Sequence, residues 1–192
     1  MQHPYPHEPA GIGSTVALAL GVLVTLATPP VAATPPPFHP YAREIDFVDL
    51  GSALAMTAEL HGLDRRRDVL VSLVGEAEVE LSCLDPSGVR VAAQTPARRR
   101  LELSGVELLP RREVHFGRLD VEVRTDALGP TIAGAPDCPS RRWTERVEQV
   151  RFRRARVEVH QSGRDRIDLL CAFTRPSSDG RILRSRVHCF AL

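Results

Sequence analysis

Apolar and polar residues alternate with a period of two over much of this chain, which is the pattern of strands that bury one face. The clearest run covers residues 69–83, where every odd position except Gly75 is apolar and serine or glutamate occupies most positions between. Residues 47–60 alternate in the even register, and we predict a strand there as well. The alanines of this second run leave a helix as the alternative.

The turn at residues 85–88, which reads Asp-Pro-Ser-Gly, predicts a hairpin that returns into residues 89–93. Further strands are predicted at similar spacing, at residues 99–109, 113–125, 144–160, 166–173 and 183–191. Eight short β segments predict an all-β chain, folded as a sandwich or a barrel.

Three of these predicted strands change register partway along. The change falls at Gly105, at Gly117 and between Phe152 and Ala155. A one-residue shift keeps the apolar side chains inward only if the strand bulges there, and glycine is common at bulges. The alternative is that each shift marks two strands joined by a tight turn.

The N-terminal region predicts export. Residues 15–28 form an uncharged apolar run, too short to cross the roughly 30 Å of a bilayer's hydrocarbon core, and small residues up to Ala33 follow, as at a signal-peptidase site. The predicted organisation is a signal-peptide helix at 1–33, a proline-rich linker at 34–44 and a β-sandwich domain at 45–192. The stretch before the run has no lysine or arginine, so an uncleaved anchor or a misassigned start stays open. We expect a secreted, extracellular or cell-envelope-associated protein that meets the membrane only through this segment.

Cysteine usage agrees with export. An even set of four cysteines in such a chain favours two disulfides over free thiols. They are Cys83, Cys138, Cys171 and Cys189. Three pairings are open; we expect Cys83 with Cys138, since Cys83 ends an inward-facing strand and Cys138 lies in a long loop. The remaining pair then needs a loop longer than a tight turn, or a bulge, between its two strands.

Two segments carry a resemblance. The strand EAEVELSCLDPSG at 76–88 and the later PDCPSRRWTERVEQVRF at 136–152 resemble a loose group of secreted, disulfide-containing β-sandwich proteins of unknown function from high-GC Gram-positive bacteria. The resemblance covers roughly residues 69–171. It implies an exported immunoglobulin-like antiparallel sandwich, with a bridge between Cys83 and Cys138, and it implies no activity.

Charge is nearly balanced overall, at +1, but unevenly distributed. Arginine supplies every basic residue, and residues 141–192 hold thirteen arginines and six acids, against twelve and seventeen in residues 34–140. Six arginines are expected to face solvent: Arg151, Arg153, Arg156, Arg166, Arg184 and Arg186. They could bind an anionic envelope polymer or an acidic protein partner, although pairing with nearby acids is the favoured interpretation. Aromatic platforms for bases are absent, so no specific nucleic-acid binding is predicted.

The sequence holds no recognisable reaction centre. It lacks the GxSxG elbow of serine hydrolases, a glycine-rich phosphate loop and an HExxH metal spacing, so no catalytic residue, metal ligand or cofactor is predicted. The row Glu76, Glu78, Glu80 could hold a cation but is more typical of a solvated strand face. We predict a noncatalytic binding or interaction module. Two alternatives stay open: a secreted protease inhibitor presenting the disulfide-pinned loop 129–142, and an enzyme whose residues converge only in three dimensions.

Overall fold

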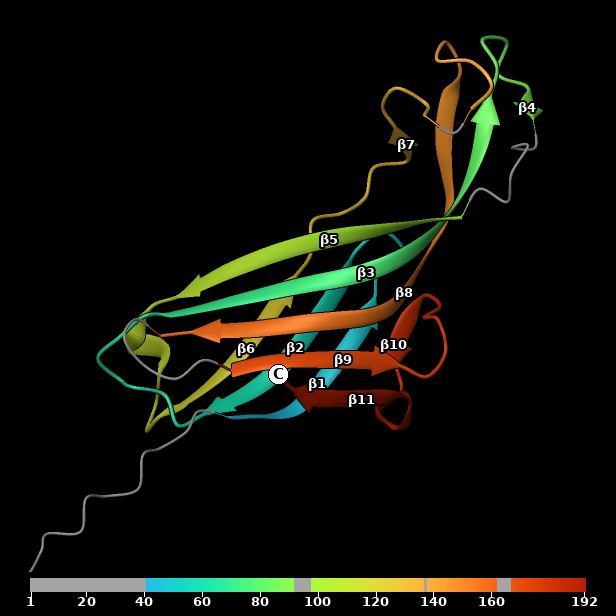
Figure 1. Ribbon diagram of the computed structural model, residues 1–192. Helices are drawn as coiled ribbons and strands as arrows, with labels where there is room; N and C mark the ends of the chain where they lie inside the picture. Colours follow the sequence, from blue (N-terminus) through green and yellow to red (C-terminus); the bar gives the residue numbers. More distant parts are fainter. Residues whose placement is uncertain (1–40, 92–97, 137, 162–166) are drawn as a thin grey trace, which may run out of the picture. The chain divides into compact units, whose positions relative to one another are not determined.

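The computed structural model describes residues 41–91, 98–136, 138–161 and 167–192 (Figure 1). The predicted signal peptide at 1–33, linker residues 34–40 and Arg166 lie outside these ranges. Within them there is no α-helix, and accordingly no helix long and apolar enough to cross a membrane.

Two antiparallel sheets pack face to face, which confirms the prediction of an all-β sandwich (Figure 1). The elements of the described chain are β1 (Tyr41–Asp49), β2 (Leu54–His61), β3 (Val69–Leu84), β4 (Arg90–Val91), β5 (Arg98–Leu109), the 3-10 turn η1 (Arg111–Glu113), β6 (Arg118–Arg124), β7 (Thr131–Ile132), β8 (Thr144–His160), β9 (Ile167–Phe173), β10 (Gly180–Ile182), η2 (Arg184–Arg186) and β11 (Val187–Ala191). The smaller sheet has the order β10-β1-β2-β6. The larger has the order β11-β9-β8-β3, with β5 beside β3, β4 on the end of β3 and β7 on the start of β8. β1 begins at Tyr41, so the last four residues of the predicted linker belong to a strand.

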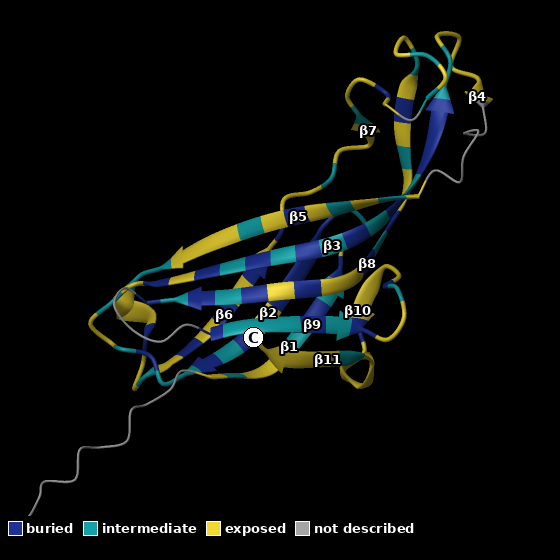
Figure 2. Ribbon diagram, in the orientation of Figure 1, coloured by how far each residue is buried: buried dark blue, intermediate teal, exposed yellow. Residues whose placement is uncertain are grey.

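The core lies between the sheets and follows the predicted period. The odd positions of β3 from Val69 to Val79 are buried, and they alternate along the strand with less buried ones (Figure 2). Gly75 breaks the apolar pattern where the larger sheet is tightly packed: a Cβ there would lie 3.0 Å from the ring of Phe152, which would have to move slightly to accommodate it. Phe47 and Leu54 supply apolar contacts from the smaller sheet.

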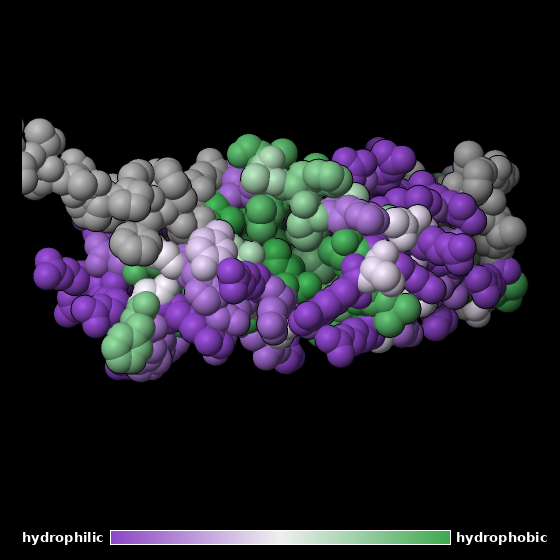
Figure 3. All heavy atoms as spheres, turned by 90° about the horizontal axis from the view of Figure 1, so that it is seen from below, coloured by the Kyte–Doolittle hydropathy of each residue, from purple (hydrophilic) through white to green (hydrophobic). Residues whose placement is uncertain are grey.

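The core reaches the surface on the side bordered by β1 and β11. Ala42, Ile45 and Val187 are half-buried against it, and Phe190 is exposed. The view from below shows apolar residues gathered in the middle of that face, with hydrophilic residues around them (Figure 3).

The single strand predicted at 47–60 is wrong: these residues form β1 and β2, joined by a turn. Gly51 adopts a φ of 81°, and its backbone N–H donates to the Asp49 carboxylate at 2.8 Å. The buried face changes register across this turn: β1 buries the odd positions Phe47 and Asp49, whereas β2 buries the even positions from Leu54 to Leu60. The apolar Val48 and Leu50 continue the even positions of β2 back through the turn, although neither is buried, and so hide it in the sequence. The helix alternative is also wrong.

The three register shifts have three different origins. The shift in β8 is a bulge, as predicted: Arg154 pairs with Glu76 and Phe152 with Ala77, which leaves Arg153 as the extra residue. The shift at Gly117 is a tight turn, the alternative interpretation, in which His115 and Arg118 exchange two backbone hydrogen bonds of 2.9 Å.

The bulge predicted at Gly105 is wrong. β5 pairs with β3 in unbroken register, and Val106 and Leu108 face outward, 60% and 64% exposed. Gly105 is required for another reason: a Cβ there would lie 1.8 Å from the carbonyl oxygen of Arg124, at the end of β6.

Both predicted disulfides are present, Cys83–Cys138 and Cys171–Cys189. Cys171 and Cys189 lie directly opposite each other in β9 and β11. The long connection that this pair requires arises because the chain leaves the larger sheet after β9, forms β10 beside β1, and returns through η2. The predicted strand at 183–191 is therefore β11 preceded by a 3-10 turn.

Candidate functional site

The six arginines predicted to face solvent do not form one surface. Arg166 lies outside the described residues. Arg151, Arg153 and Arg156 lie on β8 in the larger sheet, whereas Arg184 and Arg186 lie in η2. Arg184 binds Asp46 of the smaller sheet, so the predicted patch is divided between the two sheets.

The β8 arginines belong to a ladder of ion pairs across the larger sheet. Its acids are the row Glu76, Glu78, Glu80 of β3, and its arginines come from both neighbouring strands: Arg98 of β5 and Arg151, Arg153 and Arg154 of β8. The Glu78 carboxylate accepts a hydrogen bond from Arg153 Nε at 2.6 Å and lies 3.4 Å from Arg98. The hydrogen bond from Arg153 is the main reason that the pKa of Glu78 is lowered. We call this set the charge ladder.

Arg156 is held by a separate pair of acids. Its guanidinium donates to both oxygens of Asp168 on β9, at 3.0 and 2.8 Å, and lies 3.1 Å from Glu158. Hydrogen bonding to Asp168 raises the pKa of Arg156. Pairing with acids, which the sequence favoured over a free patch, is thus observed for each of the three β8 arginines.

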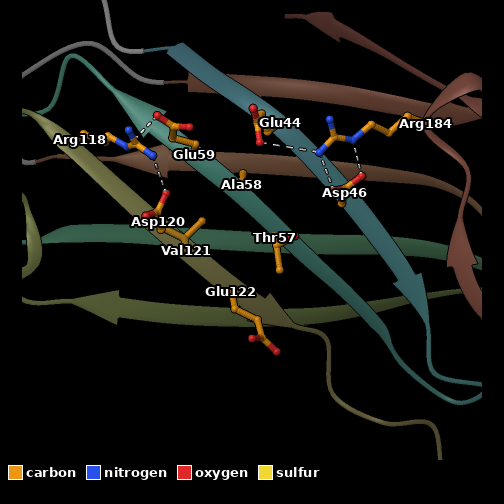
Figure 4. Close-up of a pocket in the computed structure, with 10 residues that line it drawn as sticks. All are labelled: Glu44, Asp46, Thr57, Ala58, Glu59, Arg118, Asp120, Val121, Glu122 and Arg184. Carbon is orange, nitrogen blue, oxygen red and sulfur yellow. Dashed lines mark hydrogen bonds and ion pairs between the residues drawn. The ribbon is translucent and has the colours of Figure 1, made fainter.

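Arg184 lines one end of a hollow on the outer face of the smaller sheet (Figure 4). The hollow has a volume of about 420 Å³, with Thr57 and Ala58 of β2 between two charged clusters. At one end Arg184 donates twice to Asp46 at 2.7 Å, which lowers the pKa of that carboxyl. At the other end Arg118 lies 2.7 Å from Glu59. The arginines of the hollow are engaged by its own acids.

The predicted inhibitory loop 129–142 belongs to one end of the larger sheet, which we call the arm. The arm consists of the end of β3 with β4 and the start of β8 with β7 (Figure 1). β7 pairs with the start of β8, and Cys138 fixes the segment to Cys83. Glu145 is fully buried beside this bridge, 3.5 Å from the guanidinium of Arg99. Arg141 and Arg142 are exposed.

The sequence did not single out the most unusual residue at the surface. Phe116 is 96% exposed and has a φ of 52°, in the left-handed region. It occupies the first central position of a two-residue hairpin turn between His115 and Arg118, followed by Gly117 with a φ of 80°. Such turns favour asparagine followed by glycine, because both residues need positive φ.

Phe116 belongs to a surface built from two loops, residues 62–68 and 110–117, which we call the turn end. Leu63 N–H donates to the Gly117 carbonyl at 3.1 Å, and Arg111 N–H donates to Asp68 at 2.8 Å, which joins the loops. The buried Gln161 side chain fixes the first loop through hydrogen bonds of 2.8 Å to both backbone groups of Asp64.

The turn end is rich in exposed arginine. Its loops contain five arginines and three acids. Four of the arginines form no ion pair with any described residue: Arg65, Arg66, Arg111 and Arg112. The register shift at Gly117 left a tight turn open as the alternative interpretation, but it did not indicate that Phe116 would be exposed or that these two loops would meet.

The buried polar residues differ in how they are satisfied: the Glu145 carboxylate oxygens accept no hydrogen bond from a described residue, whereas two others pair with each other. Asp49 and Ser177 are both buried, and Ser177 Oγ donates to Asp49 while accepting from Phe152 N–H at 2.6 Å. Burial is the main reason that the pKa of Asp49 is raised. Within the described ranges, no three His, Cys, Asp or Glu side chains gather to hold a metal ion. Neither a protein-family model nor a curated protein matches this chain.

Proposed function

We propose that the protein is a noncatalytic binding module that acts at the cell surface or in the medium, and that the turn end is its contact surface. The observation that carries the proposal is Phe116, exposed at 96% on a backbone with a φ of 52°. Left-handed backbone costs a side-chain-bearing residue roughly 1–2 kcal/mol, and no packing of this ring offsets that cost. Strained residues and exposed aromatics beside arginine are both concentrated at recognition sites.

The compartment rests on the disulfides. Two bridges favour an oxidising, extracellular-type environment. The signal peptide and secretion itself stay predictions, since residues 1–40 lie outside the described ranges. The immunoglobulin-like assignment and the relation to secreted Gram-positive proteins also stay predictions, because no family model or curated protein matches the chain.

Retention on the producing cell's envelope tests the contact surface. The change is Phe116→Ser in the full chain, with Phe190→Ser as control, because Phe190 is also exposed but lies on β11. Loss of an interface anchor should lower the envelope-bound fraction by roughly tenfold for Phe116→Ser only. Circular dichroism should show that both variants fold. Equal retention of the two folded variants would overturn the turn end as the contact surface.

A second candidate is a secreted protease inhibitor. It is favoured by the exposure of Arg141 and Arg142 in a segment held by Cys138. Inhibitory loops need such rigidity, because a fixed loop loses little entropy on entering a protease cleft. Incubation with trypsin would test it: an inhibitor should form a stable stoichiometric complex that Arg141→Ala with Arg142→Ala abolishes, whereas simple cleavage would exclude it.

A further inference from the structure

We propose that the turn end docks on an anionic lipid bilayer, with Phe116 entering the interface between headgroups and acyl chains and the surrounding arginines contacting lipid phosphates. This inference rests on the proposed function and names the partner of the same surface.

The first support is the position of Phe116. Its turn is closed by two backbone hydrogen bonds between His115 and Arg118, and the flanking Val114 and Leu119 are buried. The ring is therefore presented on a firm hairpin tip rather than on a loose loop. An exposed apolar ring at such a tip gains hydrophobic energy only when a partner removes it from water, and the bilayer interface accommodates aromatic rings readily.

The second support is the charge around this ring. Arg65, Arg66, Arg111 and Arg112 are exposed and have no ion pair with a described residue. Two of the neighbouring acids hold backbone groups: Asp64 accepts from Arg66 N–H at 3.0 Å, and Asp68 accepts from Arg111 N–H. The four guanidinium groups are thus available to phosphate oxygens, which they can bind with two parallel hydrogen bonds.

The third support is where the described chain begins. In the smaller sheet Tyr41 pairs with His61, and His61 with Arg118, so the start of β1 lies at the turn end. Tyr41 is exposed, and Arg43 lies over its ring at 5.3 Å. Tyrosine and arginine are typical of membrane interfaces, where an apolar body and a polar group are both accommodated. The chain therefore enters the domain, from the segment with the predicted export signal, at this same end.

These observations favour a bilayer over a soluble anionic polymer. An extended polyanion is best matched by a long row of unpaired cations. In this domain the long row of arginines is the charge ladder, which is paired with glutamate, whereas the four arginines of the turn end without a described ion pair lie in the two loops that adjoin a single apolar tip.

A local fluorescence probe tests the docking directly. The chain has one tryptophan, Trp143, in the arm, so a Trp143→Phe background makes a Phe116→Trp variant report on the tip alone. We expect its emission to shift to the blue and to be quenched by brominated acyl chains in vesicles of phosphatidylcholine with phosphatidylglycerol, but not in phosphatidylcholine alone. Phe190→Trp in the same background should not respond. The probe reports only on its own position, so binding through the N-terminal segment does not imitate the result.

Charge and alternative ligands complete the test. Added salt should weaken the response, and replacing Arg65, Arg66, Arg111 and Arg112 by serine should lower apparent vesicle affinity at least roughly tenfold. An unquenched probe on vesicles that capture the protein would overturn bilayer docking. So would binding of soluble dextran sulfate at the same arginines without any response to vesicles. If Phe116→Ser still loses envelope retention in either case, the proposed function stands and only the bilayer is excluded.

Discussion

The charge ladder and the turn end contain the same basic residue in opposite situations. On the larger sheet, β3 lies between β5 and β8, so Glu78 meets arginines from both sides. At the turn end Asp64 and Asp68 accept hydrogen bonds from loop backbone. Asp64 also pairs with Arg67, but Arg65 and Arg112 form no ion pair with a described residue. Arginine count is therefore a poor guide to binding surfaces. An arginine on this protein is paired where the strand register places a carboxylate beside it, and unpaired where it does not.

The two regions also differ in what they contribute to stability. Each partly exposed pair in the ladder contributes roughly 0.2–1 kcal/mol, and neighbouring pairs share partners. The turn end contains Phe116 in a strained conformation with its ring in water. The charge ladder stabilises the fold, whereas the turn end lowers its stability. The exposed Phe116 therefore needs an explanation other than folding.

Removing the acids of the ladder should have the largest effect. Replacing Glu76, Glu78 and Glu80 by glutamine leaves the ladder's arginines facing one another, and should lower the free energy of unfolding by about 2 kcal/mol at low salt. Urea denaturation measures this, and added salt should reduce the deficit. The matched control, Arg65, Arg66 and Arg112 to glutamine, should change stability by no more than about 0.5 kcal/mol. An equal loss in both triple variants would contradict the distinction between the regions.

Relieving the strained turn should have a smaller effect of opposite sign. Phe116→Asn places the preferred residue before Gly117, and should raise the free energy of unfolding by about 1 kcal/mol. The same substitution should abolish envelope retention, so that stability and binding change in opposite directions. Phe190→Asn, in the regular strand β11, should give no such gain. A Phe116→Asn variant that is less stable would mean that the ring supports the fold.

The sequence predicted the long central strands well and the connections poorly. The predicted segment 144–160 coincides with β8. A strand that buries one face alternates apolar and polar residues whichever strands lie beside it, so its own sequence is enough to predict it. The pattern at 47–60 misled, since the apolar Val48 and Leu50 continue the even positions of β2 without being buried. In β1 the buried positions are odd, Phe47 and Asp49. The bulge predicted at Gly105 was wrong for a different reason. Glycine is required there because a Cβ would meet the backbone of Arg124 on another strand, and the periodicity of a sequence does not record such a contact.

The candidate site depended still more on tertiary structure. Arg184 was predicted as a site residue by its type, but its partner Asp46 is 138 positions away and is brought to it by β10 crossing to the smaller sheet. The glutamate row of β3 was recognised, whereas its pairing required the register of both neighbours. Phe116 was missed because an exposed aromatic and a buried one are identical in sequence, and only the turn determines which it is.

The smallest expected difference between the two regions is in how their carboxylates change stability as the pH is lowered. The pKa of Glu78 lies below its ordinary value of 4.5, chiefly because Arg153 donates to it. A carboxyl with a lowered folded-state pKa contributes stability above the unfolded-state pKa, and that contribution disappears as pH falls through the folded-state value. Glu78→Gln should therefore be less stable than wild type by roughly 0.5 kcal/mol near neutral pH, with the difference shrinking below pH 4.5.

Glu113→Gln is the control, since Glu113 at the turn end has no ion pair with a described residue. Its unfolding curve should follow wild type throughout, and a Glu78→Gln deficit that persists in acid would show that Glu78 acts through packing rather than charge.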